Sequence, residues 1–290
     1  MAVYERAYRG YAGPVTPTWS RFLIIPRYAY QRVLASRVFV AFLCLCFVFP
    51  LGAAAFIYVA HNLDKLAELG LAIDATSLIN IGGVHGLGFL RVQAALLGFV
   101  LAMIVAPTLI SADMRNNGLP LYLSRPFSRL EYMAGKFSVL AILLSAITWV
   151  PGLVLFAMQS YLAGREWLLD NWRLGAGLFA GSLIWIVAIS LVSLAVSAFV
   201  RLKILARASL FGIFFMAGGV ADAFNGMSDT VWGDLVSLGA LGNAVWSSLL
   251  GIETESTIPA AGAWAALIVV SSFCAGLLYW RIRAYEVVSS

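Results

Sequence analysis

The sequence predicts an all-α polytopic membrane protein with six transmembrane helices, and three observations point to this fold class. First, 62% of the 290 residues are hydrophobic and only 11% are charged, a balance that soluble domains do not have. Second, the chain contains six apolar runs without a charged residue. Third, the basic residues are concentrated in alternate connections between these runs. Together these features exclude an ordinary soluble enzyme or nucleic-acid-binding domain.

A helix of about 20 residues spans the hydrocarbon core of a bilayer, and five of the six apolar runs reach that length. The fifth run in chain order is shorter, and it spans only if its helix starts near Ile204 and Arg207 extends toward the headgroups. We therefore expect residues 38–290 to form a single transmembrane domain. The runs are 38–60, 92–112, 137–160, 174–200, 208–221 and 259–280.

The basic residues predict the orientation of these helices. Fifteen of the nineteen Lys and Arg side chains fall on the side that holds the N-terminus, and ten of the fourteen acidic residues fall on the other side. Because cytoplasmic loops carry the excess of basic residues, both termini should lie in the cytoplasm. The pI near 9.2 follows from these inside arginines and requires no nucleic-acid partner.

Residues 19–34 have the pattern of an amphipathic helix that lies in the membrane interface. Its apolar side chains fall within an arc of roughly 120° at helical spacing, and Arg21 and Arg32 point away from that arc. Such a helix sets its apolar face among the headgroups and its arginines near anionic lipid. We therefore expect residues 1–37 to form a cytoplasmic tail and an interfacial helix that contacts membrane lipid. A generic membrane anchor would have the same pattern.

Small residues spaced four apart predict close helix packing in two of the spans. The second span carries Ala94, Gly98 and Ala102, and the fourth carries Gly177 and Gly181. Pro107 should bend the second span near its cytoplasmic end, and Pro151 should kink the third. Four serines on the fourth span are compatible either with a polar path or with close packing: Ser182, Ser190, Ser193 and Ser197.

The connection between the second and third spans is polar and basic. Apolar residues at 119–123 are enough for a short helix along the membrane surface, which Pro126 ends because the residue before a proline avoids the α region. Ser128 and Glu131 have the spacing of a capping box, with Phe127 and Tyr132 at the flanking hydrophobic positions. The third span should therefore start near residue 129, and Lys136 should extend its ammonium group to the surface.

The segment 222–258 contains five acidic residues and no Lys or Arg, so we expect it outside. Residues 235–252 carry no charge and could form a seventh span, but that span would move Arg281 and Arg283 outside, against the positive-inside rule. We interpret the segment as a re-entrant or outer-leaflet helical hairpin that is broken at Gly239 and Gly242 and is covered by protein or faces a water-filled cavity.

The run LSRPFSRLEYMAGK at 123–136 resembles the first cytoplasmic loop of type-2 ABC-transporter permeases. The interfacial helix and the outer hairpin are similar to the elbow helix and the re-entrant helices of that family. An ordinary basic loop that only fixes topology is the alternative interpretation. Eight positions match the family's loop: Ser124, Arg125, Pro126, Ser128, Arg129, Glu131, Gly135 and Lys136.

The resemblance implies a permease subunit of an ATP-driven ABC exporter in the bacterial cytoplasmic (inner) membrane. The surface helix would be a coupling helix seated in a groove of a separate ABC ATPase subunit, which binds the ATP and Mg²⁺. Six spans form half a pore, so a second permease copy or a homologue is also implied. The residues implied in ATPase coupling are Leu119, Leu121, Tyr122, Ser124, Arg125, Pro126, Phe127, Ser128, Arg129 and Glu131.

The chain lacks residues for energy-driven chemistry of its own. Gly135 and Lys136 do not form a phosphate-binding loop, because Leu130 and Phe137 replace its first glycine and its Ser or Thr. No ionisable residue lies near the middle of a span, where ion-driven carriers usually keep one. We expect no catalytic, metal or cofactor site. The alternative function is a membrane-embedded assembly or scaffold protein that docks a non-hydrolysing partner.

Overall fold

The computed structural model describes residues 24–62, 86–116, 128–228, 230–252 and 258–282, and its regular elements within these ranges are all helices. Six helical runs in this part of the chain are long and apolar enough to cross a membrane, which confirms the predicted all-α polytopic fold. The runs are Arg37–Ala60, Leu87–Arg115, Arg129–Ala163, Arg165–Phe199, Lys203–Ser228 and Ala260–Arg281.

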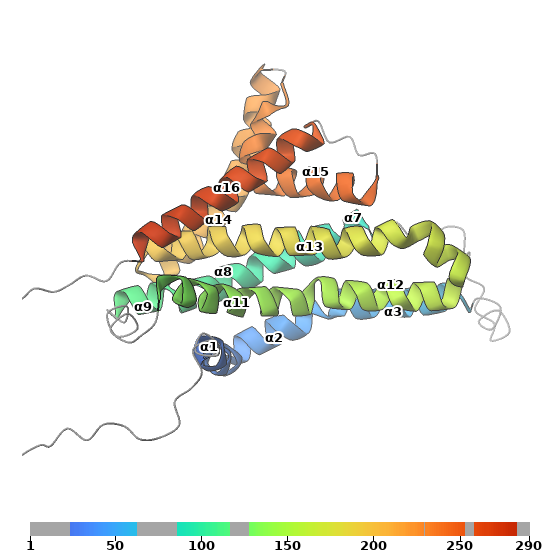
Figure 1. Ribbon diagram of the computed structural model, residues 1–290, viewed down its shortest axis with the longest axis horizontal. Coiled ribbons are helices and arrows are strands. Elements are labelled where there is room, and N and C mark those ends of the chain that lie inside the picture. The colour runs from blue at the N-terminus through green and yellow to red at the C-terminus, as the bar shows by residue number, and fades with distance from the viewer. Residues whose placement is uncertain (1–23, 63–85, 117–127, 229, 253–257, 283–290) are drawn as a thin grey trace, which may run out of the picture.

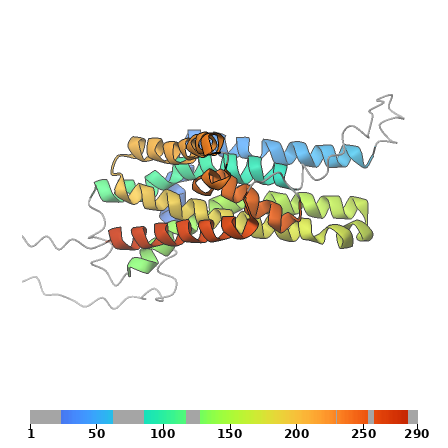
Figure 2. The same cartoon turned by 90° about the horizontal axis from the view of Figure 1, so that it is seen from above.

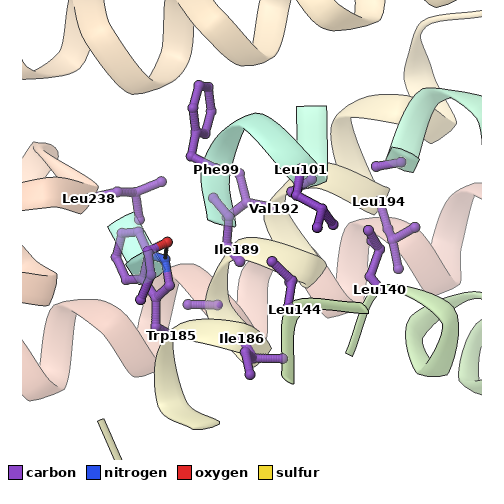
Figure 3. Close-up of a cluster of buried hydrophobic side chains, with 14 of the residues drawn as sticks. Phe99, Leu101, Leu140, Leu144, Trp185, Ile186, Ile189, Val192, Leu194 and Leu238 are labelled. Carbon is purple, nitrogen blue, oxygen red and sulfur yellow. Dashed lines mark hydrogen bonds between the residues drawn. The ribbon is translucent and has the colours of Figure 1, made fainter. Parts of the chain in front are cut away.

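Helix α13 (Arg165–Phe199) is the centre of the bundle (Figure 1). Its 35 residues rise about 52 Å, well beyond the ~30 Å hydrocarbon core. It packs against α8 (Gly98–Leu109), α11 (Arg129–Ile147), α12 (Trp149–Ala163), α15 (Leu238–Leu250) and α16 (Ala260–Arg281). Figure 3 shows the resulting core, in which Trp185, Ile189 and Val192 of α13 lie near Phe99 and Leu144.

The first, fifth and sixth spans lie at the periphery of the bundle. In the spans that contain α8 and α13, 61% of the most apolar 18-residue stretch is buried inside the bundle. In α14 (Lys203–Ser228) and α16 the buried share is 17%. Figure 1 shows α16 crossing α13 obliquely, and Figure 2 shows the same bundle from above. The peripheral helices therefore present much of their apolar surface outward, to lipid or to another protein.

Prolines divide two of the spans. The first is split between α2 (Arg37–Cys46) and α3 (Val48–Ala60), and the third is split between α11 and α12. Pro50 and Pro151 lie four residues after the last residue of the preceding helix, where a proline has no N–H to donate and its ring clashes with that residue's carbonyl. The third span therefore has its predicted kink, centred on Thr148 (φ −108°, ψ −95°).

The second span is divided into four segments. It consists of α7 (Leu87–Phe89), the π-helix η2 (Leu90–Leu97), α8 and the short helix α9 (Ser111–Arg115). Pro107 lies inside α8, and the interruption before α9 comes three residues later, at Ile110. The predicted bend is thus present near the expected end of the span, but displaced from the proline.

Buried side chains bond two of the backbone carbonyls that these irregularities leave open. Pro50 cannot donate to the Cys46 carbonyl, and the buried Gln93 donates its Nε2–H to that oxygen at 2.6 Å. In η2 the Gly98 N–H bonds the carbonyls of Gln93 and Ala95 and passes over Ala94, whose oxygen accepts a 2.8 Å bond from Trp185 Nε1. An unpaired carbonyl inside a membrane bundle costs free energy, so both contacts stabilise the bent helices.

Helix α1 (Ile24–Leu34) lies across the bundle instead of along it, since Figure 1 views it end-on while α11 and α13 run lengthwise. It packs on α11. Its buried side chains include Ile25 and Val33, whereas Leu34, which was expected on the apolar face, is 46% exposed. A helix perpendicular to the spans has the orientation expected of an interfacial helix. Residues 19–23 of the predicted helix lie outside the described residues.

The region after α14 differs in detail from the predicted hairpin. The 3₁₀-helix η3 (Trp232–Val236) turns the chain back, and α15 follows. Gly239 and Gly242 were expected to break the hairpin, but both lie inside the continuous helix α15. The break is at Ser237, which accepts a hydrogen bond from Ala240 N–H and so caps α15. Because α15 has 13 residues, it is too short to cross a bilayer and adds no seventh span.

Candidate functional site

The candidate site is the end of the bundle at which α9 ends and α11 begins (Figure 1); we call it the α9–α11 end. Three of the predicted coupling residues, Ser128, Arg129 and Glu131, are at the start of α11. The other seven lie outside the described residues, as does the predicted coupling helix itself: Leu119, Leu121, Tyr122, Ser124, Arg125, Pro126 and Phe127.

A reciprocal pair of hydrogen bonds fixes the first turn of α11. Ser128 Oγ accepts a 3.2 Å bond from the Glu131 N–H, and Glu131 Oε2 accepts a 2.6 Å bond from the Ser128 N–H. These contacts form a capping box, which satisfies two backbone donors that a helix start otherwise leaves open. The third span consequently begins at Arg129, and the direction of the chain entering it is defined.

A buried ion pair joins the last turn of the second span to the third. Lys136 Nζ lies 2.7 Å from Asp113 Oδ2, with side-chain exposures of 7% and 13%. The Tyr132 hydroxyl donates to the same carboxylate oxygen at 2.9 Å, and Lys136 Nζ also lies 5.3 Å from the centre of the Tyr132 ring. We call Asp113, Tyr132 and Lys136 the clamp. The prediction that Lys136 extends to the surface is wrong, because the carboxylate of Asp113 holds its ammonium inside the bundle.

The clamp joins the helix that precedes residues 117–127 to the helix that follows them. Asp113 is on α9, just before the loop, and Lys136 is in the second turn of α11, just after it. Two charges withdrawn from water attract each other strongly, and separating them would leave each buried without a partner. Ser111 Oγ adds a 2.9 Å bond to the carbonyl of Ser197 near the end of α13. The residues on either side of 117–127 are therefore joined by direct contacts to one another and to α13.

Helix α1 covers the same end of the bundle. Its Tyr30 hydroxyl approaches the carbonyl oxygens of Ser138 and Val139 on α11 at 3.4 Å each. Burial raises the pKa of Tyr30 to about 12, so the hydroxyl stays protonated at physiological pH and remains a donor. Helix α1 is thus attached to α11, the helix that follows residues 117–127.

The predicted small packing residues lie in two different contacts. Ala94 and Ala102 are fully buried in the core, and a Cβ on Gly98 would come to 3.4 Å from Leu144 of α11. A Cβ on Gly177 would come to 3.0 Å from Leu250, and one on Gly181 to 2.8 Å from Trp246. The glycine pair of the fourth span therefore receives α15, the short outer helix, rather than another spanning helix.

The four serines of α13 are all fully buried inside the bundle. Ser197 Oγ donates to the carbonyl of Ser193 within the helix at 2.7 Å. The described neighbours offer the hydroxyls of Ser182, Ser190 and Ser193 no hydrogen-bond partner. These positions are in close-packed surroundings, which favours the packing interpretation over the polar path.

Sequence reasoning missed two buried polar contacts, the clamp at the α9–α11 end and the Gln93 contact with the first span. Asp113 and Lys136 are 23 positions apart in the sequence, and each could equally lie in an exposed loop. The one sequence signal for an ion pair is that opposite charges stand at neighbouring ends of two consecutive spans. Gln93 is a lone amide in an apolar run. A signal for it was available, since a buried amide needs a partner and Pro50 leaves a carbonyl without its helical donor.

Comparison of the sequence with protein-family models and with curated proteins finds no match. The function is therefore argued from the site and from the loop sequence.

Proposed function

We propose that this chain is the membrane-spanning permease subunit of an ATP-driven ABC exporter. The observation that supports the proposal is that the described part of the permease-like run 123–136 is held by the capping box and by the clamp, which joins the second span to the third on either side of residues 117–127. A coupling segment has to be firmly connected to the membrane helices, so that a movement of the soluble partner also moves these helices. Both ends of this loop meet that requirement.

The proposed cycle divides the work between two proteins. A separate ATPase subunit binds ATP and Mg²⁺, and its movement displaces the loop. Because the clamp couples α9 to α11, the displacement tilts the second and third spans together, and α13 follows through its contacts with both. The exposed apolar surfaces of α14 and α16 are compatible with a second permease copy or a homologue that completes the pore, with both termini in the cytoplasm of a bacterium.

Charge reversal in the loop tests this proposal. The double variant Arg125→Glu and Arg129→Glu should lose the ATPase partner or uncouple hydrolysis from transport. Both arginines belong to the matched run, and glutamates in their place would repel the acidic groups that the arginines would contact on the partner. Co-purification of an ATPase subunit from the native membrane measures the first effect, and vanadate-sensitive hydrolysis measures the second.

A matched control is Arg201→Glu with Lys203→Glu. These two side chains are exposed in the connection from α13 to α14 at the same end of the bundle, and the change in charge is identical. The control should keep the partner and the activity. Unchanged assembly and hydrolysis in the Arg125 and Arg129 variant would contradict the proposal and favour the scaffold interpretation.

A further inference from the structure

A cavity lies beside the clamp, between α1 and the ends of the second and third spans. Its volume is about 280 Å³, near the lower limit of small-ligand sites. Tyr28 and Arg32 at its rim are exposed, whereas Lys136 is buried, so the cavity opens to the surface along α1. The lining residues are Ile25, Tyr28, Ala29, Arg32, Val33, Thr108, Leu109, Asp113 and Lys136.

The charges that line this cavity sum to one positive charge. Lys136 and Asp113 neutralise each other at 2.7 Å, which leaves the Arg32 guanidinium. Among the described residues no carboxylate forms an ion pair with Arg32, and its charge repels that of Lys136. A monoanion between the two cations would relieve this repulsion and complete the charge balance.

We propose that the cavity binds the phosphate group of an anionic phospholipid. A phosphodiester carries one negative charge, and the planar guanidinium of arginine recognises phosphate oxygens with paired donors. The Tyr28 hydroxyl at the rim supplies a further donor. The phosphate would lie against Arg32, and the lipid would join α1 to the clamp.

The surroundings favour a lipid over a free phosphate compound. Helix α1 has the orientation of an interfacial helix, which places the cavity at the level of the headgroups. Ile25, Ala29, Val33 and Leu109 give it apolar walls, which suit the glycerol and first acyl carbons of a lipid. The inference is independent of the ATPase partner proposed above.

Native mass spectrometry of the full purified chain tests this site. Phosphatidylglycerol and phosphatidylcholine of equal acyl length are titrated onto the wild type and onto Arg32→Gln and Arg27→Gln. Arg27 is the matched control, since it is exposed on the same helix and does not line the cavity. The wild type should bind phosphatidylglycerol more tightly, Arg32→Gln should lose about tenfold in affinity because it loses charge-assisted hydrogen bonds to the phosphate, and Arg27→Gln should keep most of the wild-type affinity.

Equal losses in the two variants would overturn the proposal, because they would indicate general attraction to a basic surface. A wild type without preference for phosphatidylglycerol would overturn it as well. Inorganic phosphate serves as the competing source: release of the bound lipid by phosphate at millimolar concentration, dependent on Arg32, would assign the site to a free anion. A second variant, Ala29→Leu, narrows the cavity without changing its charge and should also weaken phosphatidylglycerol binding. A thermal melt of the same variant checks that it is folded.

Discussion

Asp113 and Lys136 carry opposite charges at a place in the bundle where both side chains are largely shielded from water. The pair is kept because each group has a partner, and the Tyr132 hydroxyl supplies a further bond to the carboxylate. Removing one charge leaves the other buried and unpaired, which is costlier than removing both. The free energy of the clamp therefore depends on the pair and not on either residue alone.

A double-mutant cycle measures this dependence. Asp113→Leu and Lys136→Met should each destabilise the chain by about 3–5 kcal/mol, seen as a lower melting temperature in detergent. The double variant should recover most of that loss, because it leaves no buried charge without a partner. Tyr132→Phe removes the hydroxyl that donates to the Asp113 carboxylate and should cost about 1–3 kcal/mol. Additive losses in the double variant would show that the two side chains do not interact.

Among the helices, α15 is held in the bundle by glycines on both sides of its contact with α13. Gly177 and Gly181 of α13 leave room for Leu250 and Trp246, and Gly242 of α15 leaves room for Trp185. Trp246 Nε1 donates to the Gly181 carbonyl at 3.1 Å, and the rings of Trp185 and Trp246 are 5.2 Å apart. The short outer helix is thus a packed part of the core.

Two glycines of α15 should respond oppositely to alanine. A Cβ at residue 242 would lie 2.7 Å from Trp185 Cζ3, and that ring cannot move freely because its Nε1 bonds the Ala94 carbonyl. Gly242→Ala should therefore destabilise the chain by about 1–3 kcal/mol. A Cβ at residue 239 would have no neighbour closer than 3.9 Å, so Gly239→Ala should be neutral or slightly stabilising. Thermal melts of the two purified variants in the same detergent check this contrast. Equal melting temperatures would contradict the packing described for α15.

The helices were largely predictable because apolar length and basic flanks follow directly from bilayer thickness. The kink at Thr148 was predictable as well, since Pro151 removes a specific donor. The error at Gly239 and Gly242 has a physical cause: glycine can mark either a break or a close approach, and sequence alone does not distinguish them. At Gly242 the reason is close approach, because the Trp185 ring packs directly against this position.

The candidate site was less predictable than the helices. The capping box is local, so the spacing of Ser128 and Glu131 is sufficient to place it. The clamp depends on how α9 and α11 pack, and a lysine in the second turn of a span is equally suited to reach the surface. The presence of α1 over this end, with Tyr30 contacting α11, is a tertiary feature that no local pattern contains.

For the whole molecule, the second and fourth spans are the most buried, whereas the first, fifth and sixth present most of their apolar surface outward, to lipid or to another protein. The long central helix α13 connects the α9–α11 end to the opposite end, where Gly164 (φ 94°) turns α12 into α13. Force applied to the loop would therefore travel through contiguous packed helices. An exporter subunit and a scaffold protein differ in whether the partner that binds this end of the bundle hydrolyses ATP.

Affinity purification of the tagged chain from its native membrane in mild detergent, followed by an ATPase assay of the eluate, tests the central claim most directly. The exporter proposal predicts a co-purifying nucleotide-binding subunit and hydrolysis that vanadate inhibits. Recovery of the chain alone, or with partners that bind no nucleotide, would contradict the proposal and assign the loop to docking without hydrolysis.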